Sequence, residues 1–231
     1  MLKEKNNLEI IDGGFFYGYF TEKIIRKIPR KKIKIHGFEP NVELNNYYPK
    51  QVKKYINNGD IIINNLALSD KNEITDFYKG PYKATNSLLK RPNENYFKYY
   101  PNHANLNKKS SIETICLDDY FIDKNIKFID LVKLDLQGGE IKALNGCKEI
   151  LNTHKTDIIY SECVFIEKYK DQPKLYHLWE LMESYSYSLF SLVDISKGNY
   201  DLRSNRYIKK QWNQADAIFI SPRIRHMIEN C

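Results

Sequence analysis

The feature that most constrains the fold is a set of short apolar runs that each stop at an acidic residue. The runs read LEII, IKIHGF, FIDLVKL and DIIYS, and they end at Asp12, Glu39, Asp135 and Glu162. Short apolar runs that stop at a polar turn are typical of buried parallel strands. Segments of helical periodicity separate them, so the sequence predicts a doubly wound, mostly parallel α/β sheet. Antiparallel pairing is expected only at its C-terminal end.

The chain has 231 residues, no internal repeat and no Ser/Gly linker, so we expect one domain over 1–231. Besides the run that ends at Asp135, we expect strands over 8–11, 33–38, 61–68, 157–161, 187–193 and 216–221. Helices are expected over about 18–28, through the forties and fifties with a break at Pro49, from the Gly138-Gly139 turn to about Asn152, and near 174–184. Residues 80–111 show no such pattern.

Composition excludes several classes of protein. No apolar run is long enough to span a bilayer, and the N-terminus does not read as a signal peptide. The four cysteines form no C-x-x-C pair, so we expect a reducing, cytoplasmic setting. The histidines are not spaced like metal ligands, so we expect no metal site. The net charge is +7. The chain is also rich in Lys, Asn, Ile and Tyr, as an A/T-rich genome would produce whatever the function, and this bias explains the charge. Nucleic acid is therefore not the expected partner.

The four acidic strand ends indicate a ligand that contains a nucleoside. In open α/β sheets ligands bind beyond the carboxyl ends of the strands, and an acid that ends the second strand, here Glu39, holds the ribose hydroxyls. The first turn reads DGGFFYG and not G-x-G-x-x-G, and its bulky residues fill the space of a pyrophosphate. S-adenosylmethionine, a cation without phosphates, fits these features. Gly14 and Gly18 can instead serve only the turn and helix packing.

Several segments together resemble a known family. They are DGGFFYG, FEP, LALSD, LDDYF and IDLVKLDLQGGEIKALNGC, which contains a K-x-D-x-x-G-x-E core from Lys133 to Glu140. This set, from about residue 9 to 193, resembles the FkbM family of S-adenosylmethionine-dependent methyltransferases. The resemblance implies a Rossmann-like class I fold and O-methyl transfer in glycan, lipopolysaccharide or natural-product synthesis.

The resemblance also implies a set of cofactor contacts. It places the methionine end beside the first turn, the ribose at Glu39 and the adenine beside the third strand. The cofactor-binding residues expected from it are Asp12, Gly13, Gly14, Tyr17, Gly18, Glu39, Pro40, Leu66 and Ala67. The chain departs from the family at Phe15 and Phe16, where small residues and an Asn are usual. About seven residues precede the first strand, so we expect either a minimal member or a domain of a longer protein.

Three carboxylates are candidates for the base that methyl transfer to a hydroxyl requires. Asp135 is the first candidate and Glu162 the next, because both end central strands and face the cleft. Glu140 lies in the first turn of the following helix, where stabilisation of the helix N-terminus is the alternative role. Asp135 can also serve to tie down the Gly138-Gly139 turn. Lys133 is expected to pair with Asp119 or Glu162.

Residues 80–111 are expected to form a substrate-binding insertion. Asn86 and Ser87 supply groups for hydroxyl recognition, and His103 is the one histidine placed to reach a substrate, whereas His36 is expected to be satisfied within the sheet. The aromatic cluster at 96–100 can stack on sugar faces or belong to a small hydrophobic cluster.

The sequence thus predicts an S-adenosylmethionine-dependent O-methyltransferase for a hydroxyl of a sugar or glycan precursor. The alternatives are a methyltransferase for another small molecule or RNA, and a non-catalytic nucleoside-binding scaffold.

Overall fold

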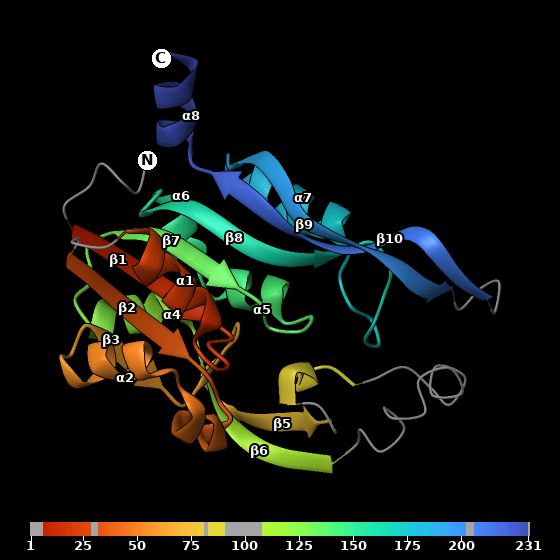
Figure 1. The fold of residues 1–231 in the computed structure, drawn as a ribbon. Helices are drawn as coiled ribbons and strands as arrows, with labels where there is room; N and C mark the ends of the chain where they lie inside the picture. Colours follow the sequence, from red (N-terminus) through yellow and green to blue (C-terminus); the bar gives the residue numbers. More distant parts are fainter. Residues whose placement is uncertain (1–6, 29–31, 81–82, 91–107, 202–205, 231) are drawn as a thin grey trace.

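A seven-stranded, mostly parallel sheet forms the centre of the chain, as the computed structural model shows (Figure 1). The structure describes residues 7–28, 32–80, 83–90, 108–201 and 206–230. The strand order is β3-β2-β1-β7-β8-β10-β9. The strands are β1 (Asn7–Gly13), β2 (Lys32–Phe38), β3 (Ile61–Asn64), β7 (Ile129–Leu134), β8 (Thr156–Val164), β9 (Ser188–Asp201) and β10 (Arg206–Ile220).

Strand directions confirm the expected doubly wound α/β topology. The pairs β1–β2, β2–β3, β1–β7 and β7–β8 are parallel, and β10 runs antiparallel to both β8 and β9. From β1 the chain winds outward to β2 and β3, then returns to place β7 and β8 on the other side. Strand order therefore reverses at β1, and the carboxyl ends of β1 and β7 are where such folds bind ligands.

Helices cover the two faces of the sheet with separate cores (Figure 1). On one face α1 (Tyr19–Lys27) and α2 (Lys50–Asn57) pack on β1 and β2, and their buried contacts include Ile25 and Val52. The other face is covered by α4 (Leu117–Asp123), α5 (Glu140–Asn145), α6 (Lys148–Asn152) and α7 (Leu175–Ser184). The chain ends with α8 (Pro222–Glu229), where the Ser221 hydroxyl accepts a hydrogen bond from the Ile224 N–H.

The segment expected as one strand over 61–68 is two strands in different sheets. The β3 strand ends at Asn64, and β4 (Ala67–Leu68) belongs to a second sheet of order β4-β6-β5. The other members, β5 (Ile74–Lys79) and β6 (Lys108–Ile115), pair antiparallel. Both were missed in the sequence because neither shows apolar alternation: β6 is largely exposed and mostly polar, and the buried residues of β5, Phe77 and Tyr78, are adjacent in the sequence.

Other boundaries differ in smaller ways. The helix expected through the forties and fifties is a 3₁₀ turn, η1 (Val42–Tyr47), followed by α2, with Pro49 between them. The helix expected to run to Asn152 is divided into α5 and α6 at Gly146, where a side chain would meet the Ser69 carbonyl oxygen at 2.1 Å. The strands β9 and β10 are longer than expected and reach beyond the end of β8 (Figure 1).

A glycine turn joins β1 to α1 at the centre of the sheet edge. Gly14 has φ +73°, and a Cβ there would meet the Asp135 carbonyl oxygen at 1.9 Å, so only glycine fits between the two strands. The N–H groups of Gly14 and Phe15 both donate to the Phe38 carbonyl oxygen at 3.0 Å. The turn is therefore fixed to both neighbouring strands.

The aromatic residues of this turn point in different directions. The Phe15 ring is buried in the core below the turn and packs edge to face against Tyr48, with the ring centroids 5.3 Å apart. The Phe16 side chain lines the cavity above the turn. Of the two phenylalanines, only Phe16 therefore lies beside the cavity in which a ligand would bind.

Candidate active site

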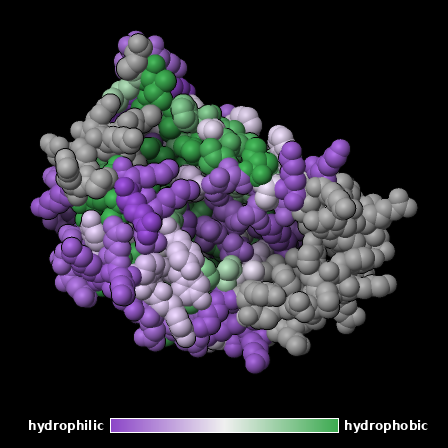
Figure 2. Space-filling model, in the orientation of Figure 1, coloured by the Kyte–Doolittle hydropathy of each residue, from purple (hydrophilic) through white to green (hydrophobic). Residues whose placement is uncertain are grey.

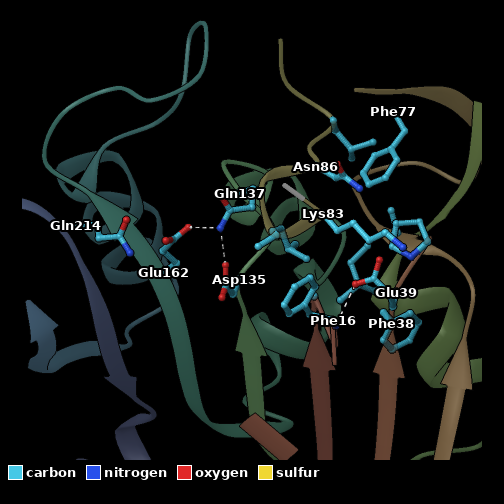
Figure 3. Close-up of a pocket in the computed structure, with 17 residues that line it drawn as sticks. Phe16, Phe38, Glu39, Phe77, Lys83, Asn86, Asp135, Gln137, Glu162 and Gln214 are labelled. Carbon is cyan, nitrogen blue, oxygen red and sulfur yellow. Dashed lines mark hydrogen bonds between the residues drawn. The ribbon is translucent and has the colours of Figure 1, made fainter. Parts of the chain in front are cut away.

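A cavity of about 250 Å³ lies beyond the carboxyl ends of β1, β2, β7 and β8 (Figure 3). The second sheet and a 3₁₀ turn, η2 (Lys83–Thr85), cover one side, and Gln214 of β10 reaches it from the other. Figure 2 shows the surface hollowed at this place, with mostly hydrophilic residues around it. Its wall comprises Gly14, Phe16, Phe38, Glu39, Pro40, Ala67, Leu68, Phe77, Lys83, Ala84, Asn86, Leu88, Asp135, Leu136, Gln137, Glu162 and Gln214.

Glu39 presents a carboxylate that the backbone holds in place. One carboxylate oxygen accepts from the Phe16 N–H at 3.0 Å, and the other accepts from the Asn41 N–H at 2.9 Å. Burial raises the pKa of Glu39, and these two hydrogen bonds oppose the increase. Because a carboxylate has about four lone-pair sites, each oxygen retains capacity for a further donor. A pair of neighbouring hydroxyl groups suits this arrangement.

The opposite end of the cavity holds two carboxylates joined by one amide. The Nε2 of Gln137 donates to Asp135 at 2.9 Å and to Glu162 at 3.3 Å (Figure 3). The Tyr169 hydroxyl lies 3.0 Å from the Gln137 Oε1, which fixes the orientation of the amide. Asp135 directly follows β7, and Glu162 lies in the neighbouring parallel strand β8, one residue after the partner of Leu134, so the sheet itself brings the two acids together.

The pKa of Glu162 suits a candidate base. Burial, together with the charges of Asp135 and Glu140, raises the pKa of Glu162 to about 8, and Lys168 at 3.9 Å opposes the increase. A group with a pKa near the working pH both accepts and releases protons readily. Desolvation and a specific charged neighbour in a cleft are the combination that marks functional acids.

Asp12 lies below the cavity and not in its wall. Its Oδ2 accepts from the Thr21 hydroxyl at 2.8 Å, and its Oδ1 lies 3.1 Å from the Lys133 Nζ. Burial raises the pKa of Asp12, and Lys133 opposes the increase. Lys133 also donates to the carbonyl oxygens of Gly13 and Gly14 at 3.0 and 2.8 Å. The pairing of Lys133 with Asp119 or Glu162 was therefore the wrong expectation, because the strand register sets Asp12 directly beside Lys133.

Glu140 stabilises the start of α5, the role that the sequence analysis gave as the alternative to catalysis. Its Oε1 accepts from the N–H groups of Leu136 and Gly138 at 2.7 and 3.2 Å, which ties down the turn at the start of α5. Burial and the charge of Asp135 raise the pKa of Glu140 to about 7. Glu140, and not Asp135, is thus the carboxylate that fixes the Gly138-Gly139 turn.

The structure brings together one part of the expected site and leaves another part outside it. The cavity wall includes Gly14, Glu39, Pro40, Ala67, Asn86, Asp135 and Glu162. Asp12, Gly13, Tyr17, Gly18, Leu66, Ser87 and Glu140 are not among the residues that form the wall. His103 and the aromatic cluster at 96–100 lie outside the described residues.

Two of the residues outside the wall hold neighbouring segments in place. The buried Ser87 hydroxyl donates to the Gln137 carbonyl oxygen at 2.7 Å, so it ties the residues after η2 to the turn after β7. His36 is satisfied as expected, with its ring nitrogens 2.8 Å from the Tyr120 hydroxyl and 2.6 Å from Glu9.

Sequence reasoning missed several residues of the wall. Gln137 is the most important of them, and its only signal is its position between Asp135 and the glycine pair. Phe77 and Gln214 lie on β5 and on the extended part of β10, where no motif marks them. Within the described ranges, no group of three or more His, Cys, Asp or Glu side chains could hold a metal ion. None of the helices there combines the length and apolar character needed to cross a membrane.

The comparison with known families decides where the chain belongs. The methyltransferase FkbM domain matches residues 13–189, which include the β1 turn, Glu39, Asp135 and Glu162. The chain belongs to the FkbM methyltransferase family. Because this is a family of S-adenosylmethionine-dependent methyltransferases, membership implies the use of that cofactor.

Individual relatives agree with the FkbM assignment. The 2-O-methyltransferase NoeI of Sinorhizobium fredii is 30% identical over 126 residues, which are 52% of this chain and 50% of NoeI. The crystal structure of methyltransferase FkbM from Methylobacillus flagellatus KT superposes with a TM-score of 0.58 at 14% identity, over 93% of this chain and 44% of that one. The small RNA methyltransferase HEN1 gives a TM-score of 0.50 at 9% identity, over 96% of this chain and 24% of that one.

The two structural likenesses show the fold, a Rossmann-like methyltransferase sheet with antiparallel strands near the C-terminus. The chain spans about half the length of the curated relative it matches.

Proposed function

We propose that this FkbM domain transfers a methyl group from S-adenosylmethionine to a hydroxyl oxygen of a sugar or glycan precursor. The observation that carries the proposal is the arrangement of one cavity. A carboxylate suited to two hydroxyls, Glu39, lies at one end, and Glu162, whose pKa is raised, lies beside a second carboxylate at the other. The similarity to a 2-O-methyltransferase supports oxygen as the accepting atom.

The residues of the wall fit the proposed cofactor. Glu39 would accept hydrogen bonds from the two ribose hydroxyls, and Phe38, Pro40 and Ala67 offer apolar surface to an adenine. Gly14 lines the wall and has no side chain, so the methionine end could approach its backbone. When bound, S-adenosylmethionine supplies an electrophilic methyl group on a positively charged sulfur.

Glu162 is the residue we propose to take the proton. When the acceptor oxygen displaces sulfur from the methyl carbon, the Glu162 carboxylate would receive the hydroxyl proton. Burial and the charge of Asp135 keep the pKa of Glu162 high, and Gln137 holds both acids in position. Positioning and proton removal are the main contributions that a protein can make to such a displacement.

The described part of the 80–111 insertion is the proposed acceptor side of the cavity. Lys83, Ala84, Asn86 and Leu88 all line the wall. The Asn86 side-chain oxygen accepts from the Gly80 N–H at 2.9 Å, which leaves its amide N–H₂ for an acceptor hydroxyl.

Calorimetry and radiolabelled methyl transfer test the proposal together. We expect the protein to bind S-adenosylmethionine and S-adenosylhomocysteine, and to transfer label to some members of a panel of saccharides. Binding of neither cofactor form would favour the scaffold alternative. Transfer to RNA or to non-sugar small molecules, with no transfer to any saccharide, would overturn the assignment of the acceptor.

A further inference from the structure

Four aromatic rings form a cluster beside the mouth of the cavity. They belong to Phe16, Tyr17, Tyr19 and Tyr47, and we call them the aromatic cluster. Ring centroids lie 4.1 Å apart for Phe16–Tyr17, 5.5 Å for Tyr17–Tyr19 and 6.2 Å for Tyr17–Tyr47. In Figure 2 residues of intermediate hydropathy form a pale area next to the hollow.

Two rings of the aromatic cluster are exposed, and the other two, Phe16 and Tyr17, are half-buried. Tyr19 and Tyr47 are 60% and 63% exposed, although large aromatic side chains are usually well buried. Phe16 has φ +51°, an uncommon conformation for a bulky residue, and its N–H is held by Glu39. This conformation is what allows the Phe16 ring to line the cavity and to contact the cluster at the same time. Uncommon backbone conformations are often found at functional sites.

Two of the cations near the cluster are already paired with carboxylates. The Lys83 ammonium lies 5.4 Å from the centroid of the Tyr47 ring, but it pairs with Glu43 at 3.0 Å. At the start of α1, Glu22 pairs with Arg26 at 2.9 Å. A site for nucleic acid needs several cations free to neutralise phosphates, in addition to aromatic faces. These two pairings leave Lys83 and Arg26 less available to phosphates, which favours a neutral ligand over a nucleic acid.

We propose that the aromatic cluster binds a second sugar unit of the acceptor, outside the cavity in which methyl transfer takes place. Tyrosine offers both an apolar ring face and a hydroxyl, which suits the apolar faces and hydroxyl groups of a sugar ring. Lys83, which lines the proposed acceptor side of the cavity, lies 5.4 Å from the centroid of the Tyr47 ring, so the cluster borders that side and an acceptor chain could extend from the cavity onto the rings. This inference rests on the proposed function, and it implies that the preferred acceptor is an oligosaccharide.

The test compares matched mono- and tetrasaccharides as acceptors for radiolabelled methyl transfer. Linear glucans, mannans and N-acetylglucosamine oligomers are the probes. Tyr19→Ala/Tyr47→Ala removes two exposed rings, whereas Tyr19→Phe/Tyr47→Phe keeps the ring faces. Tyr176→Ala is the matched control, because Tyr176 is 61% exposed on α7, away from the cluster.

We expect the double alanine variant to raise KM for the best tetrasaccharide about tenfold, with kcat and the KM for the monosaccharide unchanged. The Tyr176 control should behave like the wild type, and the double phenylalanine variant, which keeps the ring faces and loses the hydroxyls, should give a KM between those of the wild type and the double alanine variant. Equal KM values in the double alanine variant and the wild type would overturn the inference. So would a gel-shift assay in which the double alanine variant alone loses binding to single-stranded RNA.

Calorimetric titration of the tetrasaccharides into the protein with S-adenosylhomocysteine separates the two proposals. If the wild type methylates no saccharide, the proposed function fails. Tetrasaccharide binding that is lost in the double alanine variant would then still support the cluster as a sugar site. Absence of any binding would overturn the cluster as well.

Discussion

The two ends of the cavity hold their carboxylates in different ways. At one end backbone N–H groups from two segments hold both oxygens of Glu39. At the other end the partners of Glu162 are side chains, Gln137 and the more distant Lys168, and a second carboxylate lies beside it. Backbone donors favour the charged form and fix its position, whereas a neighbouring carboxylate favours the protonated form. The first arrangement suits binding and the second suits proton transfer.

Glu162→Gln should produce the largest effect and is the strongest test of this comparison. The substitution keeps the shape and removes the basicity, so we expect kcat to fall by about 10²- to 10⁴-fold. Affinity for S-adenosylmethionine, measured by calorimetry, should change little. Because a base works only when deprotonated, wild-type kcat should rise with pH up to about 8 and then level off. The variant should lose this inflection.

Asp135→Asn is the companion variant. Removal of the neighbouring charge should lower the pKa of Glu162, so the inflection should move to lower pH and the loss of turnover should be smaller. If Asp135→Asn abolishes turnover while Glu162→Gln keeps the inflection, the roles of the two acids are reversed.

Stability gives a readout of the Glu162 carboxyl that does not depend on turnover. The pKa of Glu162 is raised in the folded state from an ordinary value of 4.5 to about 8. Its contribution to stability is therefore fully present below about pH 4.5 and is lost as pH rises through 8. Glu162→Gln removes the titrating carboxyl, so the free energy of unfolding should fall less as pH rises. The variant should therefore melt at a higher temperature than the wild type at pH 9.

Glu39→Ala should produce a smaller effect, and on binding instead of chemistry. Loss of charge-assisted hydrogen bonds costs roughly 1.5 to 3 kcal/mol, so affinity for S-adenosylmethionine should fall about 10- to 100-fold. Calorimetry measures this change, and kcat at saturating cofactor should stay near the wild-type value. The control is Glu180→Ala, an exposed acid on α7. Unchanged affinity in Glu39→Ala would remove Glu39 from the ribose site.

The sequence predicted the positions of these acids but not their partners. Glu39 and Glu162 could be placed because buried strands leave a clear apolar pattern, and the sheet then sets their ends at one edge. The role of Gln137 could not be predicted, because it depends on a turn with φ +54° that directs the amide between two strands. The pairing of Asp12 with Lys133 depends on the register of β1 against β7, which apolar periodicity does not specify.

Glu140→Gln should have the smallest effect on turnover, and it separates a raised pKa from a catalytic role. Burial raises the pKa of Glu140 to about 7, closer to neutrality than that of Glu162. Its carboxylate nevertheless accepts two backbone N–H groups and lies outside the cavity wall, as a positioning group would. The glutamine oxygen can still accept these hydrogen bonds, so kcat should stay within about twofold of the wild type.

Glu140→Ala should instead leave the two N–H groups without an acceptor and lower the unfolding free energy by about 1 to 3 kcal/mol in a denaturant titration. A large loss of kcat in Glu140→Gln at unchanged stability would show that Glu140 takes part in proton transfer, although backbone N–H groups hold its carboxylate. The difference between the two ends of the cavity would then fail to identify the base.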